Sequence, residues 1–426
     1  MRSLELFAGA GGLAIGTARV GFHHDSVLEW DRNACDTLRL NAPAGHGHGG
    51  AWHVAQCDIQ GYDFRPHSSK VDFVSGGPPC QPFSMGGKHL GQADERNMFP
   101  HAVRAIRDIQ PKAFIFENVK GLLRKTFANY YSYIIHQLRY PEVVKKGDEE
   151  WPDHLRRLEK LETGGKHRGL RYNVVYRLLN AADYGVPQQR WRVFIVGVRS
   201  DLGIEFSFPD KTHEEDALLR DQWVTGEYWE RHYVAKKDRP RIPVGLAKKV
   251  SGLNALWGIP MLKPWMTVRD AIHDLPQLSA GQTSSKVSNH FLNPGARSYA
   301  GHDGSPLDEP SKALKAGDHG VPGGENTLRM PDGGVRYYSV RECARIQTFP
   351  DEWTFAGSWT ESMRQLGNAV PVRLAEVVAK DLKRTIERAE SVAIKLKQAA
   401  EAFPRKRGDR VSAEVGTSGN VRRSVL

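Results

Sequence analysis

The first two hundred residues alternate between short apolar runs typical of strands and longer polar–apolar segments typical of helices. The strand-like runs lie at residues 3–7, 25–28, 71–74, 113–116, 172–178 and 192–198. This βαβ alternation predicts a doubly wound, mostly parallel α/β sheet with helices on both faces. Because ligands of such sheets bind outside the carboxyl ends of the strands, residues that directly follow these runs are the first candidates for a functional site.

The length of the chain and the changing composition along it predict several domains and segments. At 426 residues the chain exceeds what one ordinary core holds. We predict a large domain over 1–199, with an amphipathic and structural insertion at 139–169. The aromatic, proline-rich and glycine-rich stretch 200–355 predicts a smaller loop- and β-rich domain, in which loops carry recognition. Residues 356–403 return to helix, and 404–426 form a basic tail whose composition predicts disorder.

Composition limits the partners and the compartment. Sixty Lys and Arg against 49 Asp and Glu give a formal charge of +11 and a pI near 9.4, which predicts a nucleic-acid partner. The four cysteines show no Cys-x-x-Cys spacing, so we expect no metal site and a reducing compartment. The opening residues lack a signal-peptide layout, and no apolar run approaches the roughly 18 residues of a membrane span. We therefore expect a soluble, cytoplasmic monomer.

The segment Gly76-Gly-Pro-Pro-Cys-Gln-Pro-Phe-Ser84 follows a strand-like run. Pro79 and Pro82 restrict φ and remove two backbone donors, so Cys80 is held in a stiff loop. A lone thiol at a strand end is placed like a nucleophile. Taken alone, the same sequence also fits a buried structural cysteine in a rigid turn.

A glycine-rich bend, Leu4-Glu-Leu-Phe-Ala-Gly-Ala-Gly-Gly12, follows the first strand. Such a bend lets the backbone approach a ligand, and Glu29 at the end of the second strand can hold ribose hydroxyls. Ala14 stands where a dinucleotide fingerprint needs its third glycine, which disfavours a pyrophosphate-bearing cofactor and an oxidoreductase. Asp58 can reach an adenine amino group, although alone it would more often cap a helix.

Two further polar groups border strands. Glu117 directly follows an apolar strand beside the strand that leads to Cys80, where it can carry a proton for a base that a thiolate attacks. Arg190 and Arg192 precede the strand at 193–197 and could clamp a base edge and phosphates. An exposed sheet edge explains the two arginines equally well.

The order of these motifs resembles the DNA cytosine-5 methyltransferase family of bacterial restriction–modification type. The resemblance rests on the glycine loop, Glu29-Trp30, Asp58, Pro79-Cys-Gln81, Glu117-Asn-Val119, 188–192, 341–350 and Gln365-Leu-Gly-Asn-Ala-Val-Pro371. It covers about residues 2–390, except the insertion and 213–263. It implies a class I S-adenosylmethionine-dependent, Rossmann-like domain with a small target-recognition domain, and a last motif that returns the chain to the large domain.

The resemblance also implies roles for single residues. Cys80 would add to carbon 6 of a flipped-out cytosine, Glu117 would protonate ring nitrogen 3, and Arg190 and Arg192 would steady the base. S-adenosylmethionine would be held by Phe7, Ala8, Gly9, Gly11, Gly12, Glu29, Trp30, Asp58, Ile59, Pro78, Met98 and Asn368. The expected DNA contacts are Gln81, Ser84, Gln188, Lys312, Lys315, His319, Arg329 and Arg336.

We therefore expect sequence-specific methylation of cytosine in double-stranded DNA, protecting it from a partner restriction endonuclease. Two alternatives remain open: the tRNA-methylating branch of the family, whose Cys-Phe-Thr element this chain lacks, and a catalytically silent DNA-binding regulator, which need not keep Cys80 and Glu117. We place specificity in residues 285–336, with the aromatic stretch 223–265 as the alternative.

Overall fold

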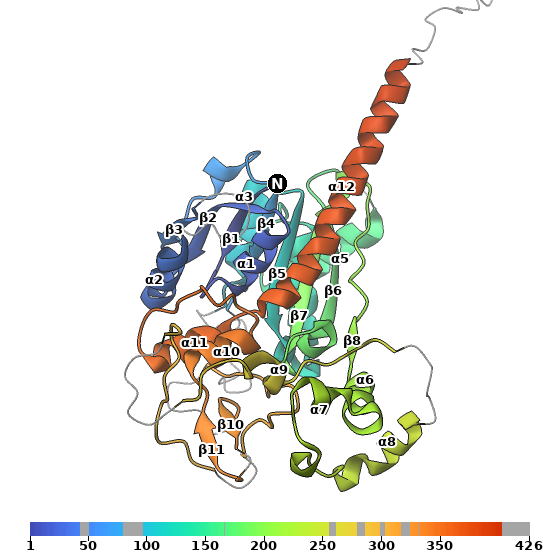
Figure 1. The fold of residues 1–426 in the computed structure, drawn as a ribbon. Coiled ribbons are helices and arrows are strands. Elements are labelled where there is room, and N and C mark those ends of the chain that lie inside the picture. Colours follow the sequence, from blue (N-terminus) through green and yellow to red (C-terminus); the bar gives the residue numbers. More distant parts are fainter. Residues whose placement is uncertain are drawn as a thin grey trace, which may run out of the picture.

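A seven-stranded sheet forms the centre of the protein in its computed structural model (Figure 1). The structure describes residues 1–42, 51–79, 97–165, 167–254, 261–278, 286–298, 303–316, 324–330 and 332–402. The strands, in spatial order β3-β2-β1-β4-β5-β7-β6, are β1 (Arg2–Leu6), β2 (His23–Glu29), β3 (His53–Gln56), β4 (Phe73–Gly76), β5 (Ala113–Val119), β6 (Tyr172–Asn180) and β7 (Trp191–Arg199).

The sheet confirms the predicted fold. Strands β1 to β5 run parallel, whereas β7 runs antiparallel to both β5 and β6. All six predicted runs are strands, and β3 adds a seventh. Because β7 is reversed, its first residues lie at the same edge as the carboxyl ends of the parallel strands.

Helices cover both faces of the sheet, as alternating strand residues require. Leu4 and Leu6 face a core that includes residues of α3 (Phe99–Ile109), α4 (Ala128–Arg139) and α5 (Trp151–Gly164). The opposite core combines α1 (Gly12–Arg19) and α12 (Val372–Ala402) with the alternate strand residues. Helix α2 (Arg32–Asn41) joins β2 to β3, and the C-terminal part of α12 extends beyond the body (Figure 1).

The amphipathic helix expected in the insertion is present as α5. Its residues Leu155 and Leu158 are buried in the core that contains α4, and Trp151 packs against the same core. Gly165 ends the helix in the left-handed region, with φ near 60°. The insertion therefore adds to one face of the sheet.

The remaining part of the chain holds more helix and less sheet than expected. Its two small ladders pair β8 (His213–Glu214) with β9 (Lys263–Pro264) and β10 (Thr327–Arg329) with β11 (Val335–Tyr337). Its helices are α6 (Glu215–Arg220), α7 (Glu227–Arg231), α8 (Ala247–Asn254), α9 (Val268–Ile272), α10 (Val340–Ile346) and α11 (Trp359–Asn368). Aromatic residues of the stretch 223–265 form a cluster around Tyr228 and Trp229.

Short single turns complete the secondary structure. The 3-10 turns are Arg65–His67, Lys120–Leu123, Lys125–Phe127, Ala181–Tyr184, Ser200–Leu202, Lys236–Asp238 and Val244–Leu246, and a π turn spans Asp221–Thr225. Within the described ranges, no helix combines the length and apolar character needed to cross a bilayer.

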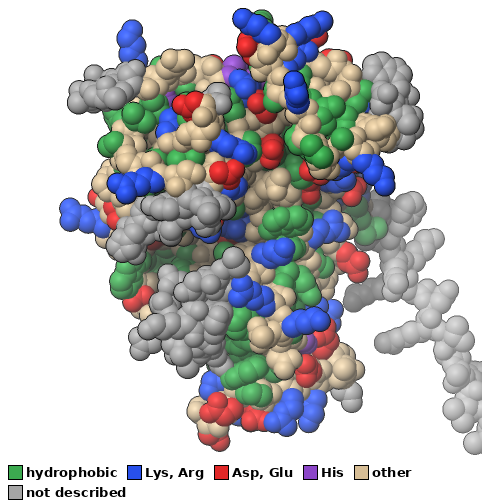
Figure 2. All heavy atoms as spheres, turned by 90° about the horizontal axis from the view of Figure 1, so that it is seen from below, with side chains coloured by type: hydrophobic (Ala, Val, Ile, Leu, Met, Phe, Trp, Pro, Cys, Tyr) green, Lys and Arg blue, Asp and Glu red, His purple; other side chains and the backbone are tan. Residues whose placement is uncertain are grey.

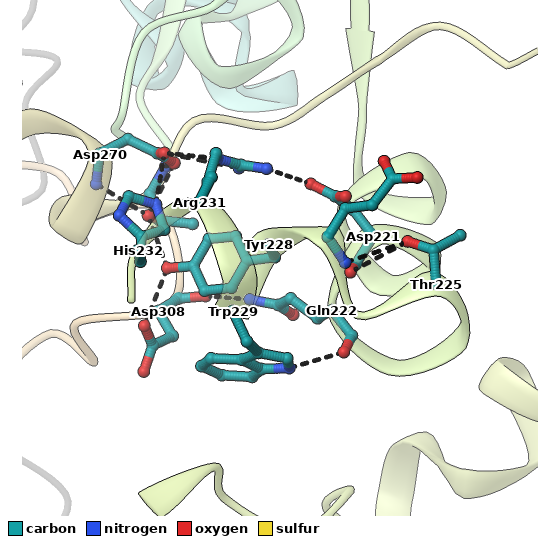
Figure 3. A network of polar contacts seen from close by, with 11 residues as sticks. Asp221, Gln222, Thr225, Tyr228, Trp229, Arg231, His232, Asp270 and Asp308 are labelled. Atoms are coloured by element: carbon teal, nitrogen blue, oxygen red, sulfur yellow. Dashed lines mark hydrogen bonds and ion pairs between the residues drawn. The ribbon is translucent and has the colours of Figure 1, made fainter. Parts of the chain in front are cut away.

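A polar network fastens the aromatic cluster to its surroundings (Figure 3). Tyr228 donates to Asp308 at 2.8 Å, and Arg231 pairs with both Asp221 and Asp270. His232 also contacts Asp270. A cavity of about 470 Å³ borders this network, and none of the predicted site residues lines it.

A third core joins the C-terminal segment to the large sheet. It combines α1 with α10 and α11 around the buried Trp353. The contact with α1 is tight, because a Cβ atom at Gly12 would lie 2.2 Å from the carbonyl oxygen of Val370. This packing brings the end of the chain back onto the first helix.

Candidate active site

The predicted cofactor and catalytic residues converge on one edge of the sheet. The glycine loop follows β1, Glu29 ends β2 and Asp58 follows β3. Glu117 lies near the end of β5, and Arg192 is the second residue of the reversed strand β7. The shared direction of the strand ends therefore brings together side chains from across the first two hundred residues.

The glycine loop exposes backbone at this edge. Phe7, Gly9 and Gly11 all have positive φ, at 54°, 53° and 90°. Phe7 pays a conformational cost there that the two glycines avoid. A Cβ atom at Gly9 would meet no atom of the described residues within 4 Å, whereas one at Gly11 would press against Leu38 and Trp353. The loop is thus packed on one side and open at Gly9.

Glu29 shapes this loop. Its carboxylate accepts hydrogen bonds from the backbone N–H groups of Gly9 at 2.7 Å, Trp30 at 2.9 Å and Asp31 at 2.8 Å. Burial raises the pKa of Glu29, and these hydrogen bonds oppose the shift. The Trp30 side chain beside it is 70% exposed. The Glu29 carboxylate, the exposed Trp30 ring and the backbone of the glycine loop thus lie next to one another.

Asp58 follows β3, with Ile59 buried next to it. Its side chain is exposed, and its carboxylate accepts a hydrogen bond from the backbone N–H of Gln60 at 2.9 Å. This bond closes a turn rather than capping a helix, because the described residues directly after Asp58 begin no helix. Met98 precedes α3 and packs against the core that contains Ile59, and Asn368 is exposed at the end of α11.

Glu117 and Arg192 form an ion pair across adjacent strands. The Arg192 Nε atom lies 2.7 Å from Glu117 Oε1, and both side chains are largely buried, at 13% and 8% exposure. Burial raises the pKa of Glu117, while Arg192 and Arg190 lower it in part. A Cβ atom on Gly77 would lie 3.4 Å from Glu117 Oε2. The carboxyl group therefore adjoins the loop that leads to Cys80.

Cys80, Gln81 and Ser84 lie outside the described residues, but the approach to them is fixed. Asn118 donates its side-chain N–H to the carbonyl of Pro78 at 2.9 Å. The backbone N–H of Met98 donates to the carbonyl of Pro79 at 3.2 Å. Sequence reasoning gave Asn118 no role, although the Glu-Asn-Val motif pointed to it. Its side chain ties the end of β5 to the cysteine loop.

The structure places Gln188 and Arg190 inside the protein rather than on a surface that faces DNA. Gln188 is completely buried, and its amide bonds to Gln347 and to the backbone of Leu314. Arg190 is 1% exposed and donates to backbone carbonyls. The two arginines thus do different things: Arg192 pairs with Glu117, and Arg190 joins segments of backbone.

The expected DNA-contacting cations have acidic neighbours. Lys312 and Arg329 both approach Asp303, at 3.4 and 2.9 Å. Because these pairs are exposed, they are weak, and phosphates can compete for the cations. Lys315 pairs in the same way with Glu325. His319 lies outside the described residues.

Arg336 differs from these cations. Its two terminal guanidinium nitrogens, Nη1 and Nη2, donate to the two carboxylate oxygens of Glu342, which is almost fully buried. The same carboxylate accepts the backbone N–H of Ser339 at 2.8 Å in a capping box at the start of α10. This pair shapes the helix start, so the interpretation of Arg336 as a reader of bases does not fit its surroundings.

Charge is distributed broadly rather than at one point. Figure 2 shows Lys and Arg side chains spread over the underside of the molecule, with Asp and Glu side chains among them. The formal charge of +11 is therefore a net value, with acidic side chains among the basic ones on this face.

Comparison with known proteins agrees with this geometry. The sequence model of C-5 cytosine-specific DNA methylases matches residues 1–140 and 158–384, so it omits only part of the insertion between its two matched ranges. The Type II methyltransferase M.Eco47II of Escherichia coli is 33% identical over 90% of this chain and 79% of its own length. M.NgoMIV of Neisseria gonorrhoeae is 30% identical over 91% and 98%.

A solved structure supports the fold. A DNA modification methyltransferase encoded within an Escherichia coli prophage matches 91% of this chain and 99% of its own, with a TM-score of 0.52 and 20% identity. Together with the two matched ranges of the family model, these similarities show that the chain belongs to the C-5 cytosine-specific DNA methylase family.

Proposed function

We propose that this protein transfers a methyl group from S-adenosylmethionine to carbon 5 of a cytosine in a specific sequence of double-stranded DNA. The observation that carries the proposal is the buried Glu117–Arg192 pair next to Gly77, at the start of the loop that leads to Cys80. A proton donor and a nucleophile are thus supplied from adjacent strand ends, which is the pair of groups that cytosine methylation needs.

The residues at the neighbouring strand ends fit a nucleoside cofactor. The open space at Gly9 admits a ligand to the backbone, and the Glu29 carboxylate lies beside it. We assign Glu29 to the ribose hydroxyls, the exposed Trp30 ring to the adenine face and Asp58 to its amino group. When bound, S-adenosylmethionine supplies a methyl group on a sulfonium, a strong electrophile.

The chain's own residues make the cytosine reactive. Carbon 5 is a weak nucleophile, so the Cys80 thiolate adds to carbon 6 and gives the ring enamine character. Glu117 delivers a proton to ring nitrogen 3, which offsets the charge that builds up on the ring. After methylation, water accepts the carbon 5 proton, and the electron pair of the broken C–H bond expels the thiolate. Return of the nitrogen 3 proton to Glu117 then restores both Cys80 and Glu117.

Burial suits Glu117 to this step. Because burial raises its pKa, more of the carboxyl group stays protonated near neutral pH than in an exposed glutamate. Arg192 opposes the shift and is positioned to stabilise the carboxylate that remains after the proton leaves. Burial and the Arg192 partner together therefore limit the free-energy cost of both the protonated and the ionised form of Glu117.

The base must leave the duplex to reach these groups, at a cost of a few kcal/mol. We assign the binding energy that offsets this cost to phosphate contacts of the basic protein, including the exposed Lys312, Lys315 and Arg329. Relatives named as Type II methyltransferases support the further proposal that the methylation protects DNA from a partner restriction endonuclease. We propose that it acts as a monomer in the cytoplasm.

Bisulfite sequencing of DNA from cells that express the protein tests this function. The expected result is protected cytosine at one position of one short sequence, and complete conversion in cells that express the Glu117→Gln variant. Full conversion with the wild-type protein, or methylation found only in tRNA, would contradict the proposal.

A further inference from the structure

A buried polar cluster lies where segments distant in the sequence meet. It joins the approach to β7, the segment 311–316 of the predicted recognition region, and the turn at 366–369. Polar side chains this deeply buried cost free energy unless they are bonded, so their bonding pattern shows what they hold together. Among the described residues the Nε atom of Arg190 has no hydrogen-bond partner, and the bonds of the cluster are made by its other polar atoms. The members are Gln188, Arg190 and Gln347, which are 0%, 1% and 0% exposed.

Arg190 connects two of these segments. Its Nη1 atom donates to the carbonyl of Leu314 at 2.8 Å. Its Nη2 atom donates to the carbonyls of Gly367 at 2.5 Å and Ala369 at 3.0 Å. Because these last two carbonyls flank Asn368, one guanidinium fixes the backbone on both sides of a proposed cofactor residue.

The two glutamines complete the connection. Gln188 accepts the backbone N–H of Leu314 at 3.0 Å and donates to the side-chain oxygen of Gln347 at 3.1 Å. Gln347 in turn donates to the carbonyls of Leu366 at 2.6 Å and Ala369 at 3.3 Å. Both amide ends of each side chain are used, so the chain of bonds permits one orientation of each amide.

The cluster adjoins the active site and the recognition segment. Arg190 is two residues from Arg192, which pairs with Glu117, and the charges of both act on Arg190. At the other end, a Cβ atom on Gly367 would lie 2.2 Å from the backbone nitrogen of Ala316. The recognition segment therefore packs directly on the turn that carries Asn368.

We propose that Gln188, Arg190 and Gln347 are positioning residues that couple the recognition segment to the active site. They hold segment 311–316, the Asn368 turn and the start of β7 in one arrangement. DNA contacts made from the recognition segment then act on the same rigid unit that places the base and the cofactor. This inference rests on the proposed function and assigns these side chains a role other than touching DNA.

Gln347→Met tests the coupling, with Gln365→Met as its matched control. Gln365 is also a buried glutamine with both amide ends bonded, to Thr37 and to the carbonyl of Ala356, but it lies outside the cluster. Both variants lose a buried amide, so both should lose thermal stability. Only Gln347→Met should also lower kcat on a duplex with the target sequence, by about 10- to 100-fold. It should also reduce discrimination against a duplex in which one base pair of that sequence is altered.

Hydrogen–deuterium exchange provides a readout that does not depend on methyl transfer. In Gln347→Met, exchange should rise together in segments 311–316 and 188–193, whereas Gln365→Met should leave both unchanged. Equal losses of stability in the two variants, with wild-type kcat and wild-type exchange in Gln347→Met, would overturn the proposal. An inactive wild-type protein would contradict the proposed function, and the exchange comparison would still decide the coupling.

Arg190→Lys adds an independent variant. Lysine keeps the charge but offers no planar fork to reach carbonyls of separate segments. Release of the Asn368 turn should weaken binding of S-adenosylhomocysteine, about tenfold, in calorimetry. Wild-type affinity in this variant would show that Arg190 does not position Asn368.

Discussion

Single residues at the strand ends owe their proposed chemistry to burial beside a partner. Glu117 in an exposed position would be an ordinary carboxylate. Between β4 and β7, burial raises its pKa, and Arg192 at 2.7 Å keeps the ionised form accessible. Glu29 is also buried beside hydrogen-bond partners, but these partners are backbone N–H groups. Its carboxylate therefore shapes a loop.

Glu117→Gln should separate catalysis from binding. The amide keeps the size of the side chain and can still accept from Arg192, but it cannot deliver a proton to the base. We expect kcat to fall by about 10²- to 10⁴-fold, with little change in affinity for S-adenosylhomocysteine. Single-turnover methylation and calorimetry measure the two effects. A variant that keeps wild-type kcat would remove Glu117 from the mechanism.

Glu29→Gln should selectively weaken binding of the cofactor. Loss of a charge-assisted hydrogen bond to the ribose costs about 1.5–3 kcal/mol, which corresponds to a rise in Kd of about 10- to 100-fold. Asp36→Asn is the control, because it removes the same charge from the half-exposed Asp36 of α2, which pairs with Arg32 and Arg39. If calorimetry gave both variants the wild-type Kd, the assignment of Glu29 to the ribose would be wrong.

At the scale of elements, two adjacent strands share a buried carboxyl group. Glu5 of β1 is 1% exposed, and Ser75 of β4 donates to it. Burial raises the pKa of Glu5 to about 8. These two strands carry the glycine loop and the cysteine loop, so the pair links the two loops at their base. A neutral carboxyl group in this place is compatible with burial, whereas a charged one is not.

Glu5→Gln should change how stability depends on pH. The folded-state pKa of about 8 lies above the ordinary 4.5, so folding favours the neutral form. The contribution of Glu5 is full below about pH 4.5 and is lost as the pH rises toward about 8. Between pH 5 and pH 8 the wild-type protein should lose on the order of 3 kcal/mol of folding free energy through Glu5, and the glutamine variant should not. Urea unfolding measures it, and parallel curves for the two proteins would contradict the buried titration.

The elements and the strand-end residues were predictable because their signals are local. Apolar runs mark the strands, and parallel strands bring their carboxyl ends together whatever their separation in sequence. The buried cluster was not predictable in this way. The sequence assigned Arg190 to the base and Gln188 to DNA, but the carbonyls that Arg190 binds are 124 to 179 residues away. The helix signal at 267–272 corresponds to α9, whereas other helices of the recognition region were missed because the sequence there shows little clear periodicity.

At the scale of the whole molecule, the C-terminal part of the chain packs against the N-terminal part. Helices α10 and α11 share a core with α1, and Gly12 packs against the carbonyl of Val370. The glycine loop, the recognition segment and the Asn368 turn are thus parts of one packed body. This arrangement explains how residues from both ends of a 426-residue chain can serve one reaction.

The most direct test of the account is covalent trapping on a duplex that carries 5-fluorocytosine at the methylated position. After methyl transfer fluorine cannot leave as a proton would, so the bond between Cys80 and carbon 6 persists. With S-adenosylmethionine present, the wild-type protein should form a denaturation-resistant complex with this duplex. Cys80→Ser should form none, although it binds S-adenosylhomocysteine as the wild type does, because a hydroxyl is a far weaker nucleophile than a thiolate. A trapped Cys80→Ser protein, or methylation by it at the wild-type rate, would contradict the account.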